Sequence, residues 1–94
     1  MMTNQEFVKA LREATDEHFS QYGYSGDCIQ DNGDDEPTIH GSTPVYFHQY
    51  SEGRFGYSYY VDPENGREGY YSEQLYYDNL KDLLDEALPI YTWN

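Results

Sequence analysis

Apolar residues recur every three or four positions near the start of the chain, which is the spacing of one face of a helix. The members of this stripe are Phe7, Ala10, Leu11, Ala14 and either His18 or Phe19. Just before it, Thr3 and Glu6 have the spacing of a capping box, in which each side chain accepts a hydrogen bond from the other residue's backbone N–H. The pattern therefore predicts a helix over residues 4–21 that ends near Gly23.

Residues 22–44 contain many Gly, Asn, Asp and Ser residues, which favour turns. Two stretches within them, residues 28–30 and 38–40, are just long enough for short strands. Between them lies an acidic turn that includes Asp34, Asp35 and Glu36. Because a structureless loop of this length is unusual in a compact domain, we expect the two stretches to pair as a small additional hairpin.

Residues 45–71 hold more than half of the twelve tyrosines, and turn signals at residues 51–53 and 62–66 divide them. This predicts an antiparallel meander of three strands. Successive strand residues point to opposite faces. The face directed at the helices is expected to carry Val45, Phe47, Gln49, Phe55, Tyr57, Tyr59 and Val61. The opposite face then displays Tyr46, His48, Tyr50 and Tyr60, joined by Tyr70 or Tyr71 from a short third strand.

A second helical pattern follows the meander, with Ser72 as its cap and Glu73 in its first turn. Its expected buried stripe is Tyr76, Leu80, Leu83, Leu84, Ala87 and Leu88. Pro89 is expected to end this helix, and residues 90–94 to fold back so that Trp93 covers the core. The predicted fold class is α+β: a single domain, residues 1–94, with an antiparallel meander sheet of three to five strands flanked by an N-terminal and a C-terminal helix.

The charge of the chain narrows its choice of partners. Eighteen acidic residues stand against two lysines and three arginines, which gives a formal net charge of −13. Such a surface repels nucleic acid and anionic membranes and attracts basic proteins. The single Cys28, the absence of a basic N-terminal segment and the absence of a long apolar run favour a cytoplasmic location.

The predicted second helix carries Asp78, Asp82 and Asp85 at positions i, i+4 and i+7, with Glu86 beside them, which is the spacing of one helix face. On a helix they form a row with roughly 5–6 Å between neighbours, comparable to the spacing of phosphates along a nucleic-acid strand. The alternative is an ordinary solvated helix face. The tyrosine face leaves a similar choice, because tyrosine is both a good strand residue and a frequent anchor in protein interfaces.

Other site chemistries find little support in the sequence. The acidic turn departs from the calcium-loop pattern, because Gly33 comes too early and Glu36 stands where the pattern requires glycine. His18, His40 and His48 lack zinc-site spacing. The chain has no nucleophile elbow, phosphate-binding loop or dinucleotide motif. We therefore expect neither an enzyme nor a bound metal or cofactor.

In size, charge and its mixture of acids with tyrosine, the chain resembles the small acidic inhibitors of bacteriophages and mobile elements. The features that carry this resemblance are the four helix acids, the Asp34–Glu36 acids and the whole-chain composition. Anti-CRISPR and anti-restriction proteins that mimic DNA are the best-known members of this class. The resemblance implies binding to a CRISPR effector or restriction enzyme. The residues that we expect to make this contact, from their charge and their position in the predicted elements, are Asp34, Asp35, Glu36, Asp78, Asp82, Asp85, Glu86, Tyr46, Tyr50, Tyr60 and Tyr70.

Two other interpretations remain open from the sequence. An immunity protein that neutralises a basic nuclease toxin would show the same charge. Adaptation to a high-salt cytoplasm would also give few lysines and many surface acids, although it does not account for the tyrosines.

Overall fold

A computed structural model describes residues 1–41, 43–64 and 66–91, with the side chain of Tyr91 excepted. It shows a five-stranded antiparallel meander with a helix at each end of the chain, which confirms the predicted α+β class. The elements are α1 (Asn4–Phe19), β1 (Ile29–Asn32), β2 (Asp35–Ile39), β3 (Val45–Ser51), β4 (Arg54–Val61), β5 (Tyr70–Tyr77) and α2 (Leu80–Tyr91), with short 3₁₀ turns at Ser20–Tyr22 and Gly26–Cys28.

The predicted start of α1 is confirmed in detail. The backbone N–H of Glu6 donates to the Thr3 hydroxyl at 3.1 Å, and the backbone N–H of Thr3 donates to the Glu6 carboxylate at 2.9 Å. The second of these hydrogen bonds is the main reason that the pKa of Glu6 lies below its usual value. The α-helix itself ends at Phe19, and the expected final turn is a 3₁₀ turn that leads to Gly23.

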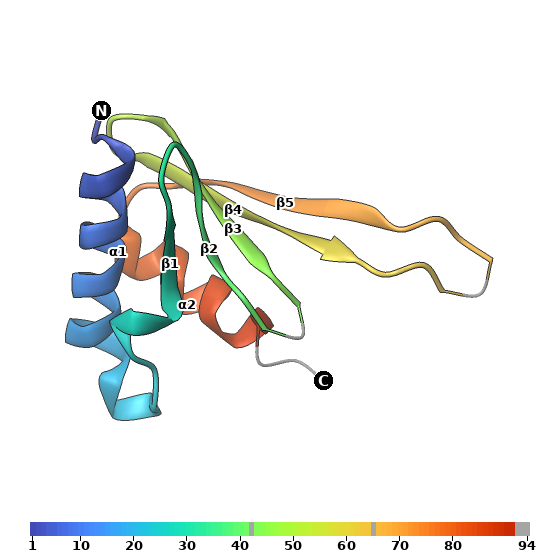
Figure 1. Ribbon diagram of the computed structural model, residues 1–94, viewed down its shortest axis with the longest axis horizontal. Coiled ribbons are helices and arrows are strands. Elements are labelled where there is room, and N and C mark those ends of the chain that lie inside the picture. The colour runs from blue at the N-terminus through green and yellow to red at the C-terminus, as the bar shows by residue number, and fades with distance from the viewer. Residues whose placement is uncertain (42, 65, 92–94) are drawn as a thin grey trace.

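Both helices pack on the same face of the sheet, and the core lies between the helices and the sheet (Figure 1). The inward-pointing strand residues meet the apolar stripe of each helix, as the alternation predicted. The buried core consists of Phe7, Val8, Leu11, Phe19, Ile29, Ile39, Val45, Phe47, Phe55, Tyr57, Leu83, Leu84, Ala87, Leu88 and Ile90. Val8 and the buried Thr15 belong to this interior but lie outside the predicted stripe; Thr15 donates to the Leu11 carbonyl at 2.8 Å, which satisfies its hydroxyl.

The short strands expected in residues 22–44 are present as β1 and β2, which pair with Ile29 opposite Ile39. The turn between them is Gly33 and Asp34, so Asp35 and Glu36 of the predicted acidic turn are the first residues of β2. The side chain of Asn4 in α1 donates to the carbonyls of Gly33 and Asp35, at 3.2 and 3.1 Å. These bonds hold the turn against the beginning of α1. Because β2 also pairs with β3, the β1–β2 hairpin extends the meander instead of forming a separate unit.

The third strand of the meander is longer than predicted. Ser72 was expected to cap a helix, but the chain continues as a strand to Tyr77 and pairs with β4, with one irregularity near Tyr76. The Tyr77 ring stacks on Tyr57, with ring centroids 5.9 Å apart. Pairing with an existing strand and stacking of this tyrosine outweigh the local helical spacing of the segment.

Helix α2 consequently begins later. The side-chain oxygen of Asn79 accepts from the backbone N–H of Asp82 at 2.9 Å, so Asn79 is its cap. Tyr76, expected in the buried stripe, is 64% exposed and has a φ of +71° at an irregularity of β5. The expectation that Pro89 ends the helix is also wrong, because α2 continues to Tyr91 and buries Ile90 against the core. The expectation for Trp93 lies outside the described residues.

Strands β4 and β5 extend well beyond the helices as a two-stranded arm (Figure 1). We call this part, residues 59–72 without Asn65, the β4–β5 arm. Its outer half has neither helix nor third strand beside it among the residues that the structure describes, so side chains on both faces reach solvent. The arm therefore adds exposed tyrosine surface on both of its sides.

Candidate partner-binding surface

The sheet face that points away from both helices is here called the open face. Cross-strand pairing fixes its membership, because residues directly opposite each other share a face. Tyr46 pairs with Ser58, Ser58 with Glu73, and Tyr60 with Tyr71. The predicted placement of Tyr46, His48, Tyr50 and Tyr60 on the face opposite the core is thus confirmed.

Three tyrosines of the open face form a continuous cluster across three strands. The ring of Tyr71 meets Tyr46 at a centroid distance of 6.2 Å and Tyr60 at 5.2 Å, both in edge-to-face geometry. Of the two candidates in β5, Tyr71 is therefore the one that joins the face. Tyr70 pairs with Val61 and points to the other side of the arm, which corrects its assignment to this surface.

Two other tyrosine contacts explain glycines in the sheet. The Tyr50 ring lies so close to Gly56 that a Cβ there would come within 2.8 Å of it, and at Gly69 a Cβ would come within 1.9 Å of the Tyr60 hydroxyl. The absence of a side chain at these two glycines therefore leaves room for the tyrosines. Burial is the main reason that the pKa of Tyr50 is raised, and the nearby carboxylates of Glu73 and Glu36 add to it.

A row of polar side chains crosses the open face from β2 to β4. The Glu36 carboxylate lies 3.1 Å from Nδ1 of His48, and Nε2 of His48 lies 2.8 Å from the Ser58 hydroxyl. This sequence of groups also occurs in serine hydrolases. Here, however, Ser58 is only 6% exposed and sits in the middle of a strand that is paired on both sides. The row satisfies a buried hydroxyl and ties three strands together.

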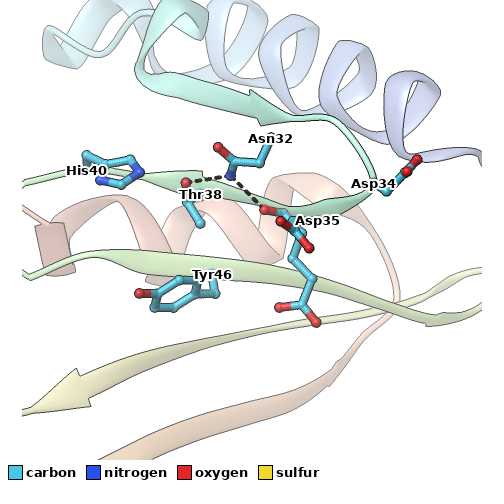
Figure 2. A pocket seen from close by; sticks show the side chains of 7 residues that line it. Asn32, Asp34, Asp35, Thr38, His40 and Tyr46 are labelled. Atoms are coloured by element: carbon cyan, nitrogen blue, oxygen red, sulfur yellow. Dashed lines mark hydrogen bonds between the residues drawn. The ribbon is translucent and has the colours of Figure 1, made fainter.

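Beside this row lies an open hollow of about 580 Å³ (Figure 2). Its lining combines acids with polar and aromatic groups: Asn32, Asp34, Asp35, Glu36, Thr38, His40 and Tyr46. The Asn32 amide donates to the Thr38 hydroxyl at 2.9 Å and to the Glu36 carbonyl at 2.8 Å, which fixes the Asn32 side chain against β2. Asp34 stands at the rim, with its side chain directed away from the other labelled residues.

The hollow suits a positively charged side chain. Within the described part of the chain, neither lysine nor arginine forms an ion pair with the acids that line it. A guanidinium or ammonium group placed there would meet carboxylates on one side and the Tyr46 ring on the other, which is the combination that favours cation–π contact. The predicted turn acids and Tyr46 are therefore brought together on one surface.

The four acids predicted to form a row on the second helix do not do so. Asp78 lies outside α2, because the helix begins only at Leu80. Asp82 accepts a hydrogen bond from the Asn79 amide at 3.0 Å, and Glu86 accepts one from the Tyr77 hydroxyl. These two acids support the junction between β5 and α2, whereas Asp85 borders a separate hollow near Tyr22 and Leu88. The α2 acids lie on the helix layer and not on the open face.

The chain matches no protein-family model, no curated protein and no solved structure. Its function must therefore be inferred from its own surface. Within residues 1–41, 43–64 and 66–91, no group of three or more His, Cys, Asp or Glu side chains is placed to hold a metal ion. None of the helices in that part of the chain is long and apolar enough to cross a membrane.

Sequence reasoning missed several exposed residues of β5. Glu73, Leu75 and Tyr76 were assigned to a helix, yet Glu73 faces Tyr50 on the open face and Arg54 lies over the Tyr76 ring at 5.5 Å. The signal that could have found them is the tyrosine content at both ends of residues 70–77, which is typical of a strand. The helical spacing of Tyr76 with Leu80 and Leu83 masked it.

Proposed function

We propose that this protein is a binding protein and not an enzyme, and that it inhibits a basic nucleic-acid-binding protein by occupying the surface that nucleic acid would use. One observation carries the proposal: the open face brings the acidic turn next to Tyr46, and Tyr46 continues into the cluster with Tyr71 and Tyr60. Acid and tyrosine thus form one continuous surface that neither helix covers.

Charge determines the kind of partner. At a net charge of −13, association with a surface rich in Lys and Arg is accelerated, whereas association with nucleic acid or another acidic protein is opposed. On the bound complex, Asp34 and Asp35 take the place of phosphates, and the tyrosine rings fill the apolar gaps between basic side chains. Ser58, whose hydroxyl hydrogen-bonds to His48 on the open face, is too buried to serve as a nucleophile.

The class of protein that combines these properties is the small inhibitor encoded by bacteriophages against host defence. We infer that the target is a nucleic-acid-binding channel of a CRISPR effector or a restriction enzyme in the host bacterial cytoplasm. We place the binding surface on the open face with the β4–β5 arm, and no longer on a row of acids along the second helix. Asp82 and Glu86 are assigned supporting roles at the β5–α2 junction.

A DNA-cleavage assay with purified CRISPR effectors and restriction enzymes tests this function. We expect the wild-type protein to block cleavage by its target at low ionic strength. The double variant Asp34→Asn/Asp35→Asn should weaken inhibition about tenfold, which corresponds to ~1.4 kcal/mol of binding free energy. Tyr46→Ala should weaken it more, because truncation of a central aromatic anchor costs about 2 kcal/mol or more.

The matched control is Glu13→Gln/Glu17→Gln, which makes the same charge change on the exposed side of α1. Inhibition by this control should stay close to that of wild type. Equal losses from the control and the open-face variants would show that net charge alone matters and would contradict the proposed surface. Inhibition confined to a nuclease toxin would instead identify an immunity protein.

A further inference from the structure

The two edges of the sheet differ in how they are protected. At one edge β1 has only four residues, and the Arg12 guanidinium of α1 donates to the Ile29 carbonyl at 2.9 and 3.1 Å. The first edge is thus short and partly capped. At the other edge β5 has eight residues and, in the part of the chain that the structure describes, pairs with β4 alone.

Apart from one irregularity near its C-terminal end, strand β5 lacks the usual defences of an exposed edge. Natural edge strands are blunted by lysine, proline or brevity, since outward N–H and C=O groups otherwise pair with another strand. The sequence of β5, YYSEQLYY, contains neither lysine nor proline, and Glu73 is its single charged residue. Its irregularity lies near Tyr76, so residues 70–74 keep a regular register along β4.

Large side chains on both faces of β5 are open to solvent. The exposed fractions are 60% for Tyr70, 63% for Tyr71, 38% for Leu75 and 64% for Tyr76. The strand begins in the β4–β5 arm, away from both helices, and runs along the outer margin of the sheet until its last residues lead back to α2 (Figure 1). An added strand would therefore find backbone groups for pairing and aromatic neighbours on both of its sides.

We propose that β5 accepts an extended basic segment of a partner protein as a sixth strand of the sheet. The negative charge of this part of the chain favours a basic partner. Residues 62–78 contain one basic residue, Arg67, and five acidic residues: Asp62, Glu64, Glu68, Glu73 and Asp78. A second copy of the chain would bring another charge of −13 to the same edge, so electrostatic repulsion disfavours self-pairing. Lysine or arginine side chains at alternate positions of an added strand would lie beside Glu73 and the tyrosines of the open face.

This inference rests on the proposed function for the basic character of the partner, but its test does not depend on finding that partner. The probe is a ten-residue synthetic peptide of alternating lysine and valine, mixed with the full-length protein. A second peptide of the same charge, with proline in place of valine, lacks the backbone N–H of every second residue and favours the polyproline II conformation, so it pairs poorly as a strand. Amide hydrogen exchange by NMR reports both the site of binding and the backbone bonds formed.

We expect the lysine–valine peptide to slow exchange of alternate amides in residues 70–74 at least tenfold, and the proline peptide to leave them unchanged. Glu73→Lys should weaken peptide binding severalfold, whereas Glu17→Lys, the same charge change on α1, should have a smaller effect. Equal binding of the two peptides, protection confined to other strands, or amides of β5 already protected by self-association would each overturn the proposal.

The two proposals can fail separately. If the open-face variants abolish inhibition of a DNA-cleaving target while β5 amides stay unprotected by either the peptide or the target, the proposed function stands and strand addition fails. If the peptide pairs with β5 and no nucleic-acid-binding protein is inhibited, strand addition stands and the proposed function fails.

Discussion

At the scale of single residues, tyrosine has three different roles in this protein. Tyr57 lies in the core, Tyr77 joins the sheet to α2 through Glu86, and Tyr46 belongs to the exposed cluster of the open face. Composition reveals the number of tyrosines but not this division. The side assignment of Tyr70 and Tyr71 depends on the β4–β5 register, which the long connection between those strands leaves open in the sequence.

Three tyrosines whose pKa is raised in the folded protein predict loss of stability at alkaline pH. Burial is the first cause of the raised pKa of Tyr50, Tyr57 and Tyr77, and the hydrogen bond to Glu86 also raises that of Tyr77. Each group is neutral when protonated, so the unfolded chain releases its protons first as pH rises above about 10. The stability from these groups is therefore complete below pH ~10 and is lost as pH rises through their raised folded-state values.

Urea unfolding between pH 8 and pH 11 measures this effect. The free energy of unfolding should be nearly constant up to about pH 9.5 and fall steeply above it. Tyr77→Phe should lower stability at pH 8 by about 1 kcal/mol, through loss of the bond to Glu86, and should make the alkaline fall shallower. An unchanged alkaline slope in this variant would show that Tyr77 is not held neutral by the fold.

At the scale of elements, most of the fold follows from the sequence because periodicity and turn chemistry agree. The capping box starts α1, and alternation places Val45 and Phe47 on the core side of β3. The exception is the segment from Ser72 to Tyr77, where helical spacing and strand composition conflict. Tertiary pairing with β4 decides it, and no local pattern contains that information.

The start of α2 gives a direct test of this boundary. Asn79→Ala removes the side chain that accepts from the Asp82 backbone N–H and should cost about 1 kcal/mol of stability. Ser72→Ala, at the position that sequence spacing suggested as the cap, should cost less than about 0.5 kcal/mol. Thermal or chemical denaturation of the two variants compares them, and a larger loss for Ser72→Ala would contradict the strand assignment.

This boundary also explains why only part of the candidate site could be predicted. Asp78, Asp82, Asp85 and Glu86 share a face only if one continuous helix contains them, and the late start of α2 removes that condition. The β1–β2 hairpin could be predicted from its short flanking strands, but the position of Asp34, Asp35 and Glu36 beside Tyr46 is seen only in the structure, because it depends on the pairing of β2 with β3.

At the scale of the whole molecule, the acids are spread over both layers, but acid and tyrosine meet on the open face. Adaptation to high salt explains the first property and not the second. If the acids serve binding and not adaptation to salt, the protein should stay folded without salt screening. The core, the Thr3–Glu6 capping box and the Tyr77–Glu86 hydrogen bond should hold the fold together.

Thermal melting at about 10 mM and about 500 mM NaCl tests this consequence, because the Debye length changes severalfold over that range. We expect a cooperative transition at both concentrations, with a midpoint only a few degrees lower at low salt owing to self-repulsion. Loss of folded structure at low salt would favour adaptation to a high-salt cytoplasm.

The most direct test of the central claim is the affinity for an inhibited target, measured across about 50–300 mM NaCl in the presence and absence of its nucleic acid. If the open face replaces phosphates, affinity should fall at least tenfold over this range. Nucleic acid and protein should also exclude each other from the target. An affinity independent of salt, or a complex that holds nucleic acid and this protein together, would contradict the account.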